Sequence, residues 1–289
     1  MSDNEAAAAA LAALPPLREV IARHGLSARR AFGQNFLLDL NLTGRIARAA
    51  GPLAGKTVVE IGPGPGGLTR ALLAGDAAEV VAVEKDRRCL EALQEVAAVA
   101  GPRLVLQEGD AMATDIAACG SPPRVIVANL PYNISTQLLL RWLSALAADA
   151  GVLEQMVLMF QAEVADRLLA APNSKDYGRL TVVTQWLCEV TRLFNIPSRA
   201  FTPPPKVNST LLSIKPRPAP LAPAEMTCLE RVTAAAFGQR RKMLRQSLKS
   251  LGLPVAALLD AAGIDGSLRA EDLSIADFCS LARLIQNPV

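Results

Sequence analysis

The chain has 289 residues, of which 51% are apolar and 20% charged, and this suits one large or two modest globular domains with a sizeable core. Its five cysteines lie far apart and His24 is its only histidine, which argues against zinc sites, haem attachment, a disulfide framework and histidine-based triads. The formal net charge is +3, but residues 1–50, 51–170 and 171–289 carry +2, −5 and +6, so a basic end beside an acidic middle predicts a polyanionic partner.

The first fifty residues predict helices and an irregular loop. Residues 6–24 have a helical composition interrupted by two prolines, and Asn41–Ala50 reads as a short amphipathic helix. Between them, Arg29–Asp39 suits either a folded-over loop or a connector with a hydrophobic staple. The start carries acids where a secretory signal has a basic region, and no apolar run could cross a bilayer, so we expect a cytoplasmic protein without a membrane partner.

A glycine-rich turn follows the first predicted strand. Thr57–Ile61 has the composition of a buried strand, and it runs into Gly62-x-Gly64-x-Gly66-Gly67 and a helix over 68–73. The glycines let the backbone come close to a ligand at the helix N-terminus. The spacing also fits the GxGxxG of NAD-binding folds, so NAD stays an alternative, whereas the missing GK[ST] excludes a P-loop.

An acid lies at the end of each of the next two predicted strands. Val80–Glu84 ends 22 residues after Gly62, where a carboxylate can accept from the ribose hydroxyls of NAD or of S-adenosylmethionine. A solvated turn is the alternative for this acid. Leu104–Ala111 is the third strand and its edge, and its Asp110 could accept from an adenine amino group or cap the following turn.

Asn129-Leu130-Pro131-Tyr132 follows the fourth predicted strand, Val125–Ala128. The side-chain carbonyl of Asn129 and the backbone carbonyl of Leu130, whose direction Pro131 helps to fix, are two acceptors that suit an exocyclic amino group. Tyr132 offers a flat face on which a base could stack. The alternative is a strand-ending turn with Asn129 as a local cap and Tyr132 in the core.

The rest of the chain predicts one more parallel strand and then a change of pattern. Met156–Phe160 is the fifth strand, and five strands separated by helical stretches predict a doubly wound, mainly parallel α/β sheet. Three later segments alternate loosely between apolar and polar residues: Leu180–Trp186, Val190–Phe194 and Asn208–Ile214. The proline-rich loop Phe201–Val207 is rigid, and Phe201 is either a second stacking face or a core anchor. Pro216–Pro223 reads as an interdomain linker.

The last segment predicts a basic helix. Phe237–Lys249 holds five basic residues and no acid: Arg240, Arg241, Lys242, Arg245 and Lys249. Arg241, Arg245 and Lys249 recur every fourth residue, so they would share one face of the helix. Leu244, Leu248 and Leu251 would share another face. This stripe is either a solvated face or a surface that contacts phosphates.

Seven segments together form an ordered set of motifs. They are Phe32–Leu37, Glu60-x-Gly62-x-Gly64-x-Gly66, Glu84, Gly109–Ala111, Asn129–Ser135, Gln161–Arg167 and Phe201–Ser209. In this order they resemble the ribosomal RNA adenine N6-dimethyltransferases, over nearly the whole chain from residue 18 onwards, and the small-subunit type fits best. The alanine-rich start and Pro204 depart slightly from the pattern.

This resemblance implies a Rossmann-like S-adenosylmethionine-dependent methyltransferase sheet with a smaller helical C-terminal domain. We expect an N-terminal helical extension over 1–28, the methyltransferase domain over 29–216 and the helical domain over 217–289. The implied cofactor residues are Asn35 and Leu37 at the methionine end, Gly62 in the turn, Glu84 on the ribose, Asp110 at the adenine and Asn129 near the transferred methyl. No metal is implied.

The implied reaction is N6,N6-dimethylation of two adjacent adenosines in a hairpin near the 3′ end of small-subunit ribosomal RNA, linked to small-subunit assembly. Acceptors from Asn129 and Leu130 would aim the lone pair of the adenine nitrogen and stabilise its growing positive charge, with Pro131 constraining the backbone. Tyr132, and Phe201 by resemblance, would hold a flipped-out base. The expected protein is a monomer whose partner is small-subunit ribosomal RNA or an immature small subunit.

Three other functions stay open. A large-subunit ribosomal RNA methyltransferase of the antibiotic-resistance type shares the core, although Leu130 and the long C-terminal domain favour the small-subunit type. An RNA-binding assembly factor with secondary methylation is the second. An NAD dehydrogenase is disfavoured because nothing that resembles a hydride-transfer acid or base follows the glycine turn.

Overall fold

The structure is a computed structural model that describes residues 3–26 and 34–286, with the side chains of residues 7–26 and 34–286. Chain contacts divide it into two compact units. Unit 1 comprises residues 1–162 and 191–215, and unit 2 comprises residues 163–190 and 216–289. Over the described ranges, no helix combines the length and apolar character that a membrane span requires.

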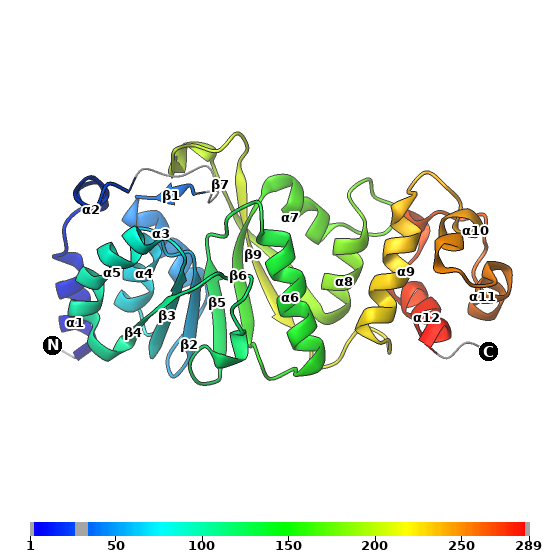
Figure 1. Ribbon diagram of the computed structural model, residues 1–289, viewed down its shortest axis with the longest axis horizontal. Coiled ribbons are helices and arrows are strands. Elements are labelled where there is room, and N and C mark those ends of the chain that lie inside the picture. The colour runs from blue at the N-terminus through cyan, green and yellow to red at the C-terminus, as the bar shows by residue number, and fades with distance from the viewer. Residues whose placement is uncertain (1–2, 27–33, 287–289) are drawn as a thin grey trace. The chain divides into compact units, whose positions relative to one another are not determined.

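Unit 1 contains a sheet flanked by helices (Figure 1). Its helices are α1 (Asp3–Ala12), α2 (Leu17–Arg23), α3 (Leu40–Ala49), α4 (Gly67–Ala74), α5 (Arg87–Ala100) and α6 (Ser135–Ala148). Its strands are β1 (Phe36–Leu37), β2 (Thr57–Ile61), β3 (Glu79–Glu84), β4 (Leu104–Glu108), β5 (Arg124–Ala128), β6 (Gln155–Gln161), β8 (Phe201–Thr202) and β9 (Ser209–Pro216). Strand β7 (Cys188–Ile196) contributes residues to both units.

Seven strands form the main sheet in the order β4-β3-β2-β5-β6-β9-β7. The first five in this order run parallel, and β9 pairs with β6 antiparallel. The predicted mainly parallel α/β sheet is therefore confirmed. The chain winds outwards from β2 in one direction and from β5 in the other, so the strand order switches between them, and ligands bind at the carboxyl ends beside such a switch.

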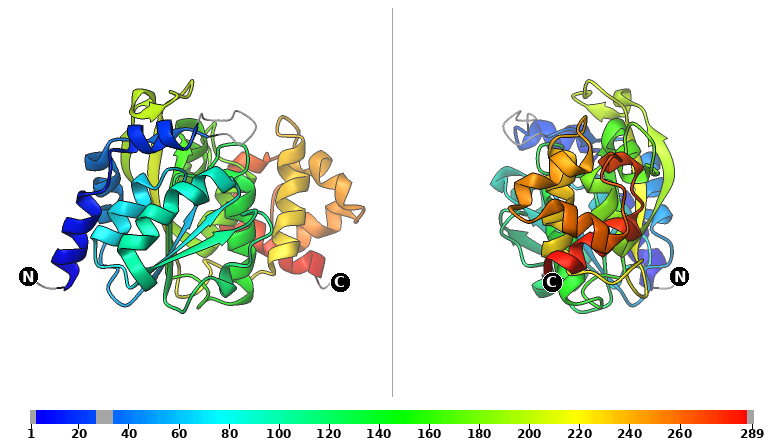
Figure 2. Two further views of the ribbon diagram at one scale, coloured as in Figure 1. Left: turned by 60° about the vertical axis from the view of Figure 1, so that its left-hand side comes forward. Right: turned by 90° about the vertical axis from the view of Figure 1, so that its right-hand side faces the viewer.

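The strands next to the switch are buried along their whole length. Every residue of β2 and β5 is buried, which requires cover on both faces of the sheet. Valines of three neighbouring strands, Val58, Val125 and Val157, share one core cluster with Leu72 of α4. Helix α1 packs against α4 and α5, as the deep-blue and cyan helices of Figure 2 show. Helices therefore hold the central strand ends in fixed positions.

The described part of unit 2 is mostly helical, and it also includes part of β7 and the last residue of β9. Its helices are α7 (Ala162–Leu169), α8 (Arg179–Leu187), α9 (Met226–Gly238), α10 (Leu244–Ser247), α11 (Val255–Ala262) and α12 (Ile275–Gln286). Helices α9 and α12 pack against each other and against α8, and the right-hand view of Figure 2 shows α9–α12 gathered together. Leu180–Trp186, which alternates loosely in sequence, is helical, and its burial from Thr181 to Thr184 means that α8 is covered on most sides, α9 and α12 supplying part of that cover.

The single basic helix expected over 237–251 is wrong. Helix α9 ends at Gly238, α10 spans only Leu244–Ser247, and a 3₁₀ turn covers Leu248–Leu251. Between the helices, Met243 forms an antiparallel β-bridge with Arg269, and the Leu244 amide donates to the Leu268 carbonyl at 2.8 Å. These bonds replace helical ones, so the basic residues do not form a stripe on one continuous helix.

The proposed linker is bonded to unit 2. The amide of Arg217 donates to the Leu187 carbonyl at 2.8 Å, and the amide of Leu221 donates to the Trp186 carbonyl at 3.0 Å. Residues 163–190 also join unit 2, although the sequence assigns them to the methyltransferase domain. The reason is that α8 packs against α9 and α12. The domain boundaries at residues 28 and 216 stay predictions.

Candidate active site

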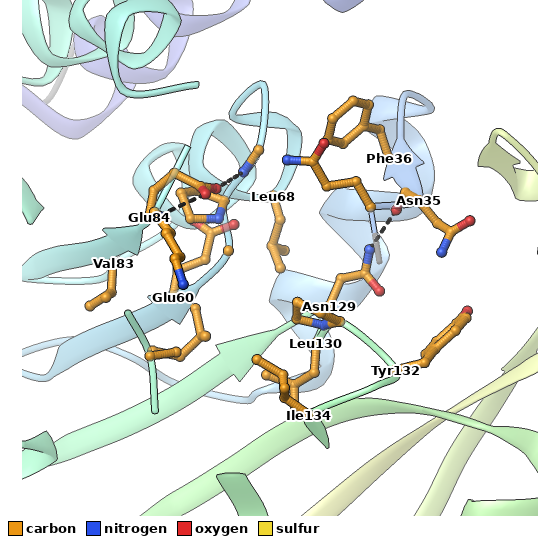
Figure 3. A pocket seen from close by; sticks show the side chains of 18 of the residues that line it. Asn35, Phe36, Glu60, Leu68, Val83, Glu84, Asn129, Leu130, Tyr132 and Ile134 are labelled. Atoms are coloured by element: carbon orange, nitrogen blue, oxygen red, sulfur yellow. Dashed lines mark hydrogen bonds between the residues drawn. The ribbon is translucent and has the colours of Figure 1, made fainter. Parts of the chain in front are cut away.

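A pocket of about 210 Å³ opens at the carboxyl ends of β2, β3, β4 and β5, beside the switch in strand order (Figure 3). Its walls are Gln34–Leu37, the turn after β2, the strand end at Glu84, the Gly109–Met112 turn and Asn129–Ile134. The fold therefore brings five of the seven sequence motifs, which lie far apart along the chain, to one cavity. Within the described residues, no group of three or more His, Cys, Asp or Glu side chains is arranged to hold a metal ion.

Two glycines of the turn lie against the segment Phe36–Leu37, where a side chain would collide with it. Gly64 has φ +57°, and a Cβ there would lie 3.0 Å from the ring of Phe36. A Cβ on Gly67, the first residue of α4, would lie 2.7 Å from the Leu37 carbonyl oxygen. The segment Phe36–Leu37 can therefore close over the turn only because these residues are glycines.

Glu84 is buried at the end of β3, with 7% of its surface exposed. Its Oε1 accepts the amides of Lys85 and Asp86 at 2.8 Å each, and its Oε2 accepts the Gly64 amide at 3.1 Å. Burial raises the pKa of Glu84, although the three amide bonds lower it. A carboxylate has about four acceptor positions, so one remains, on Oε2. The solvated turn considered for this acid does not describe it.

Glu60, which the sequence places in a motif without a role, is the second buried acid of the pocket. Only 2% of its surface is exposed, and its Oε2 accepts the Thr69 hydroxyl at 2.6 Å. Burial, with a smaller contribution from the charge of Glu84, raises the pKa of Glu60 to about 8. This shift favours the protonated form of Glu60 at neutral pH. An acid one position before the end of an otherwise apolar strand was the sequence signal for this residue.

Asp110 lines the pocket and is half-buried. Its Oδ2 accepts from Lys85 Nζ at 2.7 Å, and its Oδ1 accepts the Met112 amide at 2.9 Å. The lysine bond is the main cause of a lowered pKa for Asp110. Asp110 therefore caps the following turn, as one interpretation of the sequence expects, and it also lines the pocket, where its contact with adenine stays a prediction.

Asn129 emerges from the end of β5, and its amide is held in one orientation. Its Nδ2 donates to the Asn35 carbonyl at 3.0 Å, so its Oδ1 turns away from Asn35, on the side of Tyr132 (Figure 3). The side chain of the next residue, Leu130, is buried, and this anchors the backbone between Asn129 and Tyr132. The bond to Asn35 uses the Nδ2 of Asn129 and leaves its Oδ1 as an acceptor for a ligand in the pocket that Asn129 lines.

Tyr132 is held by a strand that is distant in sequence. Its hydroxyl and that of Ser209, a fully buried residue at the start of β9, lie 2.7 Å apart. Burial raises the pKa of Tyr132, so the phenol is neutral at physiological pH. The ring is half-buried and lines the pocket beyond Asn129. A flat face at this place suits a purine that enters beside Asn129.

A family profile described as ribosomal RNA adenine dimethylase matches residues 25–287. The chain belongs to this family. It is 62% identical over 272 residues to the ribosomal RNA small subunit methyltransferase A of Rhodospirillum rubrum, covering 94% of this chain and 93% of that one. It is 60% identical to the protein of that name from Paramagnetospirillum magneticum, covering 95% and 96%.

Two solved structures share the fold. A dimethyladenosine transferase from Plasmodium falciparum is 26% identical with a TM-score of 0.72, over 86% of this chain and 96% of that one. The 23S rRNA methyltransferase ErmE is 28% identical with a TM-score of 0.62, over 88% and 100%. The predicted Rossmann-like methyltransferase fold is therefore confirmed.

Three of the residues expected from the family motifs do not line the pocket in the described part of the chain. Phe201 pairs with Leu37 between β8 and β1 and is only 2% exposed, so the core-anchor alternative describes it here. It does not line the pocket, and a stacking role stays a prediction. Phe32 and Gly33 lie outside the described residues, whereas Asn35 and Leu37 line the pocket as expected.

The basic residues of this family member differ in what they can bind. Arg240 is paired with Glu271 at 2.9 Å and donates to the Ser174 carbonyl at 3.2 Å, so an acid does compensate part of the segment. The other four are exposed: Arg241, Lys242, Arg245 and Lys249. Arg240 therefore has a structural role within unit 2, and RNA binding by the exposed four stays a prediction.

Proposed function

We propose that this chain transfers methyl groups from S-adenosylmethionine to N6 of adenosines in small-subunit ribosomal RNA, yielding N6,N6-dimethyladenosine. The observation that carries this proposal is Asn129, whose Nδ2 is bonded to the Asn35 carbonyl so that its Oδ1 stays an acceptor in the pocket that Tyr132 also lines. The relatives named small subunit methyltransferase A support the substrate class.

The pocket residues fit S-adenosylmethionine. Four of the six residues of the turn from Gly62 to Gly67 are glycines, which lets the backbone come close to a ligand at the start of α4. Glu84 keeps one acceptor position at a strand end, which suits a ribose hydroxyl. Asp110 suits the adenine amino group, and Asn35 and Leu37 form the wall expected at the methionine end. NAD is disfavoured because the chain belongs to a methyltransferase family.

The residues of the chain contribute by positioning and charge stabilisation. The bound sulfonium cofactor would supply an electrophilic methyl group. Asn129 Oδ1 and the Leu130 carbonyl would accept the two amino hydrogens of adenine, which directs the nitrogen lone pair and stabilises its growing positive charge. Tyr132 would stack on the flipped-out base. The proton released from the nitrogen can pass to water, so no histidine is needed.

Finer features of the proposal follow from the family resemblance. They are two adjacent adenosines in a hairpin near the 3′ end of the RNA, an immature small subunit as the substrate particle, a link to assembly, a monomeric enzyme and a cytoplasmic location. The exposed basic residues of unit 2 would contact RNA phosphates, which fits the net charge of +6 on residues 171–289.

The main competing function is methylation of large-subunit RNA. The similarity to ErmE, 28% identical, shows that the same fold serves that substrate. The identities of 62% and 60% to small-subunit methyltransferases are much higher and favour the small subunit. A second competitor, an RNA-binding assembly factor with secondary methylation, is disfavoured by the intact Glu84, Asp110 and Asn129 in one pocket.

Methyl-labelled S-adenosylmethionine with isolated ribosomal particles tests the proposal. We expect the label in the RNA of small particles that lack the modification, recovered as N6,N6-dimethyladenosine after nuclease digestion. Label in large particles would replace this proposal by the large-subunit one. Tight binding of small particles without any label would favour the assembly factor.

A further inference from the structure

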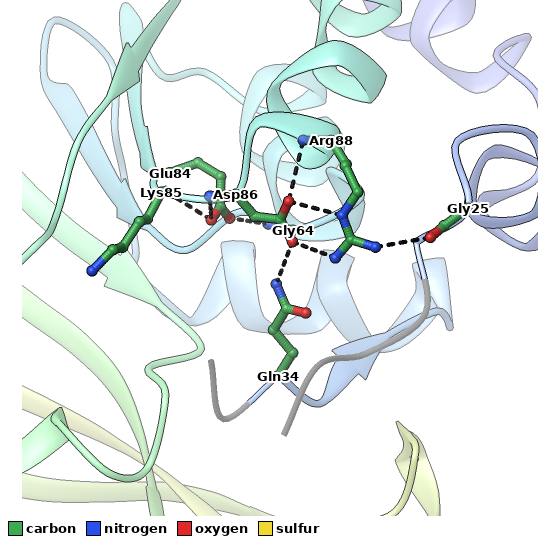
Figure 4. Close-up of polar contacts among 7 residues, drawn as sticks. All are labelled: Gly25, Gln34, Gly64, Glu84, Lys85, Asp86 and Arg88. Atoms are coloured by element: carbon green, nitrogen blue, oxygen red, sulfur yellow. Dashed lines mark hydrogen bonds and ion pairs between the residues drawn. The ribbon is translucent and has the colours of Figure 1, made fainter. Parts of the chain in front are cut away.

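Arg88, in the first turn of α5, joins two segments on either side of residues 27–33. Its Nε and Nη2 donate to Asp86 Oδ1 and Oδ2 at 3.0 and 2.6 Å, and its Nη1 donates to the Gly25 carbonyl at 2.9 Å (Figure 4). On the other side, Gln34 Nε2 donates to Asp86 Oδ2 at 3.3 Å. One arginine and one carboxylate therefore hold both Gly25 and Gln34.

The same face of α5 holds the segment that leads to Gly25. Val20 and Leu26, both essentially unexposed, share a small core cluster with Cys89 and Ala92 of α5. One turn further along α5, Glu95 pairs with Arg23 at 2.9 Å and contacts His24 at 3.3 Å. Residues 20–26 are thus fixed to α5 by apolar packing as well as by charge.

Asp86 also connects this attachment to the pocket. Its amide donates to Glu84 Oε1 at 2.8 Å, so its position is tied to the acid expected on the ribose. Gln34 is followed directly by Asn35, whose carbonyl orients Asn129. A continuous path of bonds therefore runs from Glu84 through Asp86 and the Gln34–Asn35 backbone to Asn129. Both ends of this path line the pocket.

We propose that Arg88 is a positioning residue for cofactor binding, which fixes the pocket wall Gln34–Leu37 by bracing Asp86 against Gly25. This proposal rests on the proposed function, since the ligand expected in the pocket is S-adenosylmethionine. The planar guanidinium can bind both oxygens of Asp86 and a carbonyl at once, which a lysine ammonium cannot do with the same geometry. Without Arg88, the nearly buried Asp86 carboxylate would lose its charged partner.

Arg88→Met and Arg87→Met make a matched pair of variants. Arg87 is the preceding residue of α5, is 79% exposed and pairs with Glu108 outside the pocket lining. Calorimetric titration of each full-length variant with S-adenosylmethionine, and with S-adenosylhomocysteine, gives the dissociation constants without any need for turnover. Hydrogen–deuterium exchange of peptides that cover residues 34–38 reports on the wall itself.

For Arg88→Met we expect a dissociation constant about tenfold higher, which is the size of effect that one hydrogen bond to a charged group has, together with faster exchange at residues 34–38. All three bonds of Arg88 are lost, but they act on the cofactor only through the wall of the pocket. Arg87→Met should match the wild type in both measurements. Arg88→Lys, which keeps the charge and disturbs folding less, should weaken binding about threefold, since only part of the three-bond geometry survives.

Wild-type affinity in both Arg88 variants would overturn the positioning role and leave the proposed function intact. A lower melting temperature with unchanged cofactor affinity would also overturn it, because Arg88 would then be merely structural. A wild-type chain that binds neither S-adenosylmethionine nor S-adenosylhomocysteine would instead contradict the proposed function itself.

Discussion

The carboxylate of Glu84 accepts hydrogen bonds from three backbone amides and keeps one further acceptor position. Glu84 lines the pocket, so a ligand could use this position. Replacement by alanine would leave all three amides without their partner. Glu84→Gln keeps the shape and one acceptor oxygen for Lys85 and Asp86, but its NH2 group can accept neither a ligand hydroxyl nor the Gly64 amide. We expect it to weaken S-adenosylmethionine binding by about 1.5–3 kcal/mol, the range for hydrogen bonds to charged groups. Equilibrium titration measures this loss.

The matched control is Glu108→Gln at the end of the neighbouring strand β4. Glu108 is exposed and outside the pocket lining, so its variant should bind the cofactor like the wild type. Equal affinities for Glu84→Gln and the wild type would remove Glu84 from the ribose site.

Glu60 predicts a specific dependence of stability on pH. Its pKa is raised from 4.5 to about 8 in the folded chain, so the folded state binds a proton that the unfolded state releases. The stabilisation is fully present below about pH 4.5 and is lost as the pH rises towards 8. In Glu60→Gln, which cannot ionise, this loss is absent.

Urea unfolding of both proteins from pH 5 to 8 tests this linkage. The free energy of unfolding of Glu60→Gln minus that of the wild type should grow with pH over this window. Other shifted groups, such as Glu84 and Asp86, are common to both proteins and largely cancel in the difference. A difference that stays constant with pH would show that Glu60 is ionised when folded.

Single residues at strand ends could be predicted well, but their partners could not. The position of Asn129 follows from the apolar run before it, because a buried strand exposes its polar residues at its end. Its partner Asn35 is 94 residues away, and only the folded chain shows that a backbone carbonyl fixes the amide. For Phe201 even the environment of the side chain could not be predicted, because the composition of its loop fits a core anchor and a stacking face equally.

At the scale of elements, the start of β9 fixes the loop after β5 through Ser209 and Tyr132. Ser209→Ala and Tyr132→Phe each remove this hydrogen bond and keep the ring. We expect each to slow methyl transfer about two- to tenfold, corresponding to about 0.5–1.5 kcal/mol. Because both act through one bond, the double variant should be no slower than either single variant.

The rate constants of the four proteins in this cycle, measured with saturating cofactor, decide the outcome. Effects that add in the double variant would mean that Ser209 does not act through the hydroxyl of Tyr132. Cofactor affinity serves as the internal control, and it should be the same in all four proteins because neither hydroxyl is among the proposed cofactor contacts.

Regular elements could be predicted where local pattern decides them, as in the five parallel strands. The break after α9 could not, because Arg241, Arg245 and Lys249 keep a helical spacing in sequence. After α9 ends at Gly238, Met243 pairs with Arg269 instead of continuing a helix, and this contact joins residues far apart in the chain. Likewise, β1 and β8 are short and exist only through their mutual pairing. Long-range pairing overrides local periodicity in both cases.

For the molecule as a whole, the basic C-terminal part predicts salt-dependent RNA binding. Arg241 and Arg245 are exposed, so neutralising both to glutamine should lower the affinity for small ribosomal particles. If both contact duplex phosphates, the slope of log affinity against log salt should fall by nearly two units. Filter binding over a series of salt concentrations measures this slope.

A control with the same change in net charge separates contact from general attraction. Arg87 and Arg141 are exposed residues of unit 1, and their double glutamine variant should leave the slope nearly unchanged. Cofactor affinity should be normal in both double variants. An unchanged slope for the Arg241 and Arg245 variant would mean that these side chains are only a solvated surface.

The most direct measurement is single-turnover methyl transfer to small ribosomal particles by the wild type and by Asn129→Ala, with saturating cofactor and RNA. The variant loses the acceptor that is expected to strengthen as charge develops on the adenine nitrogen, so the transfer rate should fall about a hundred- to a thousandfold. Particle binding should persist. Transfer at the wild-type rate, or a loss of particle binding in proportion to the loss of rate, would contradict the placement of the active site at Asn129.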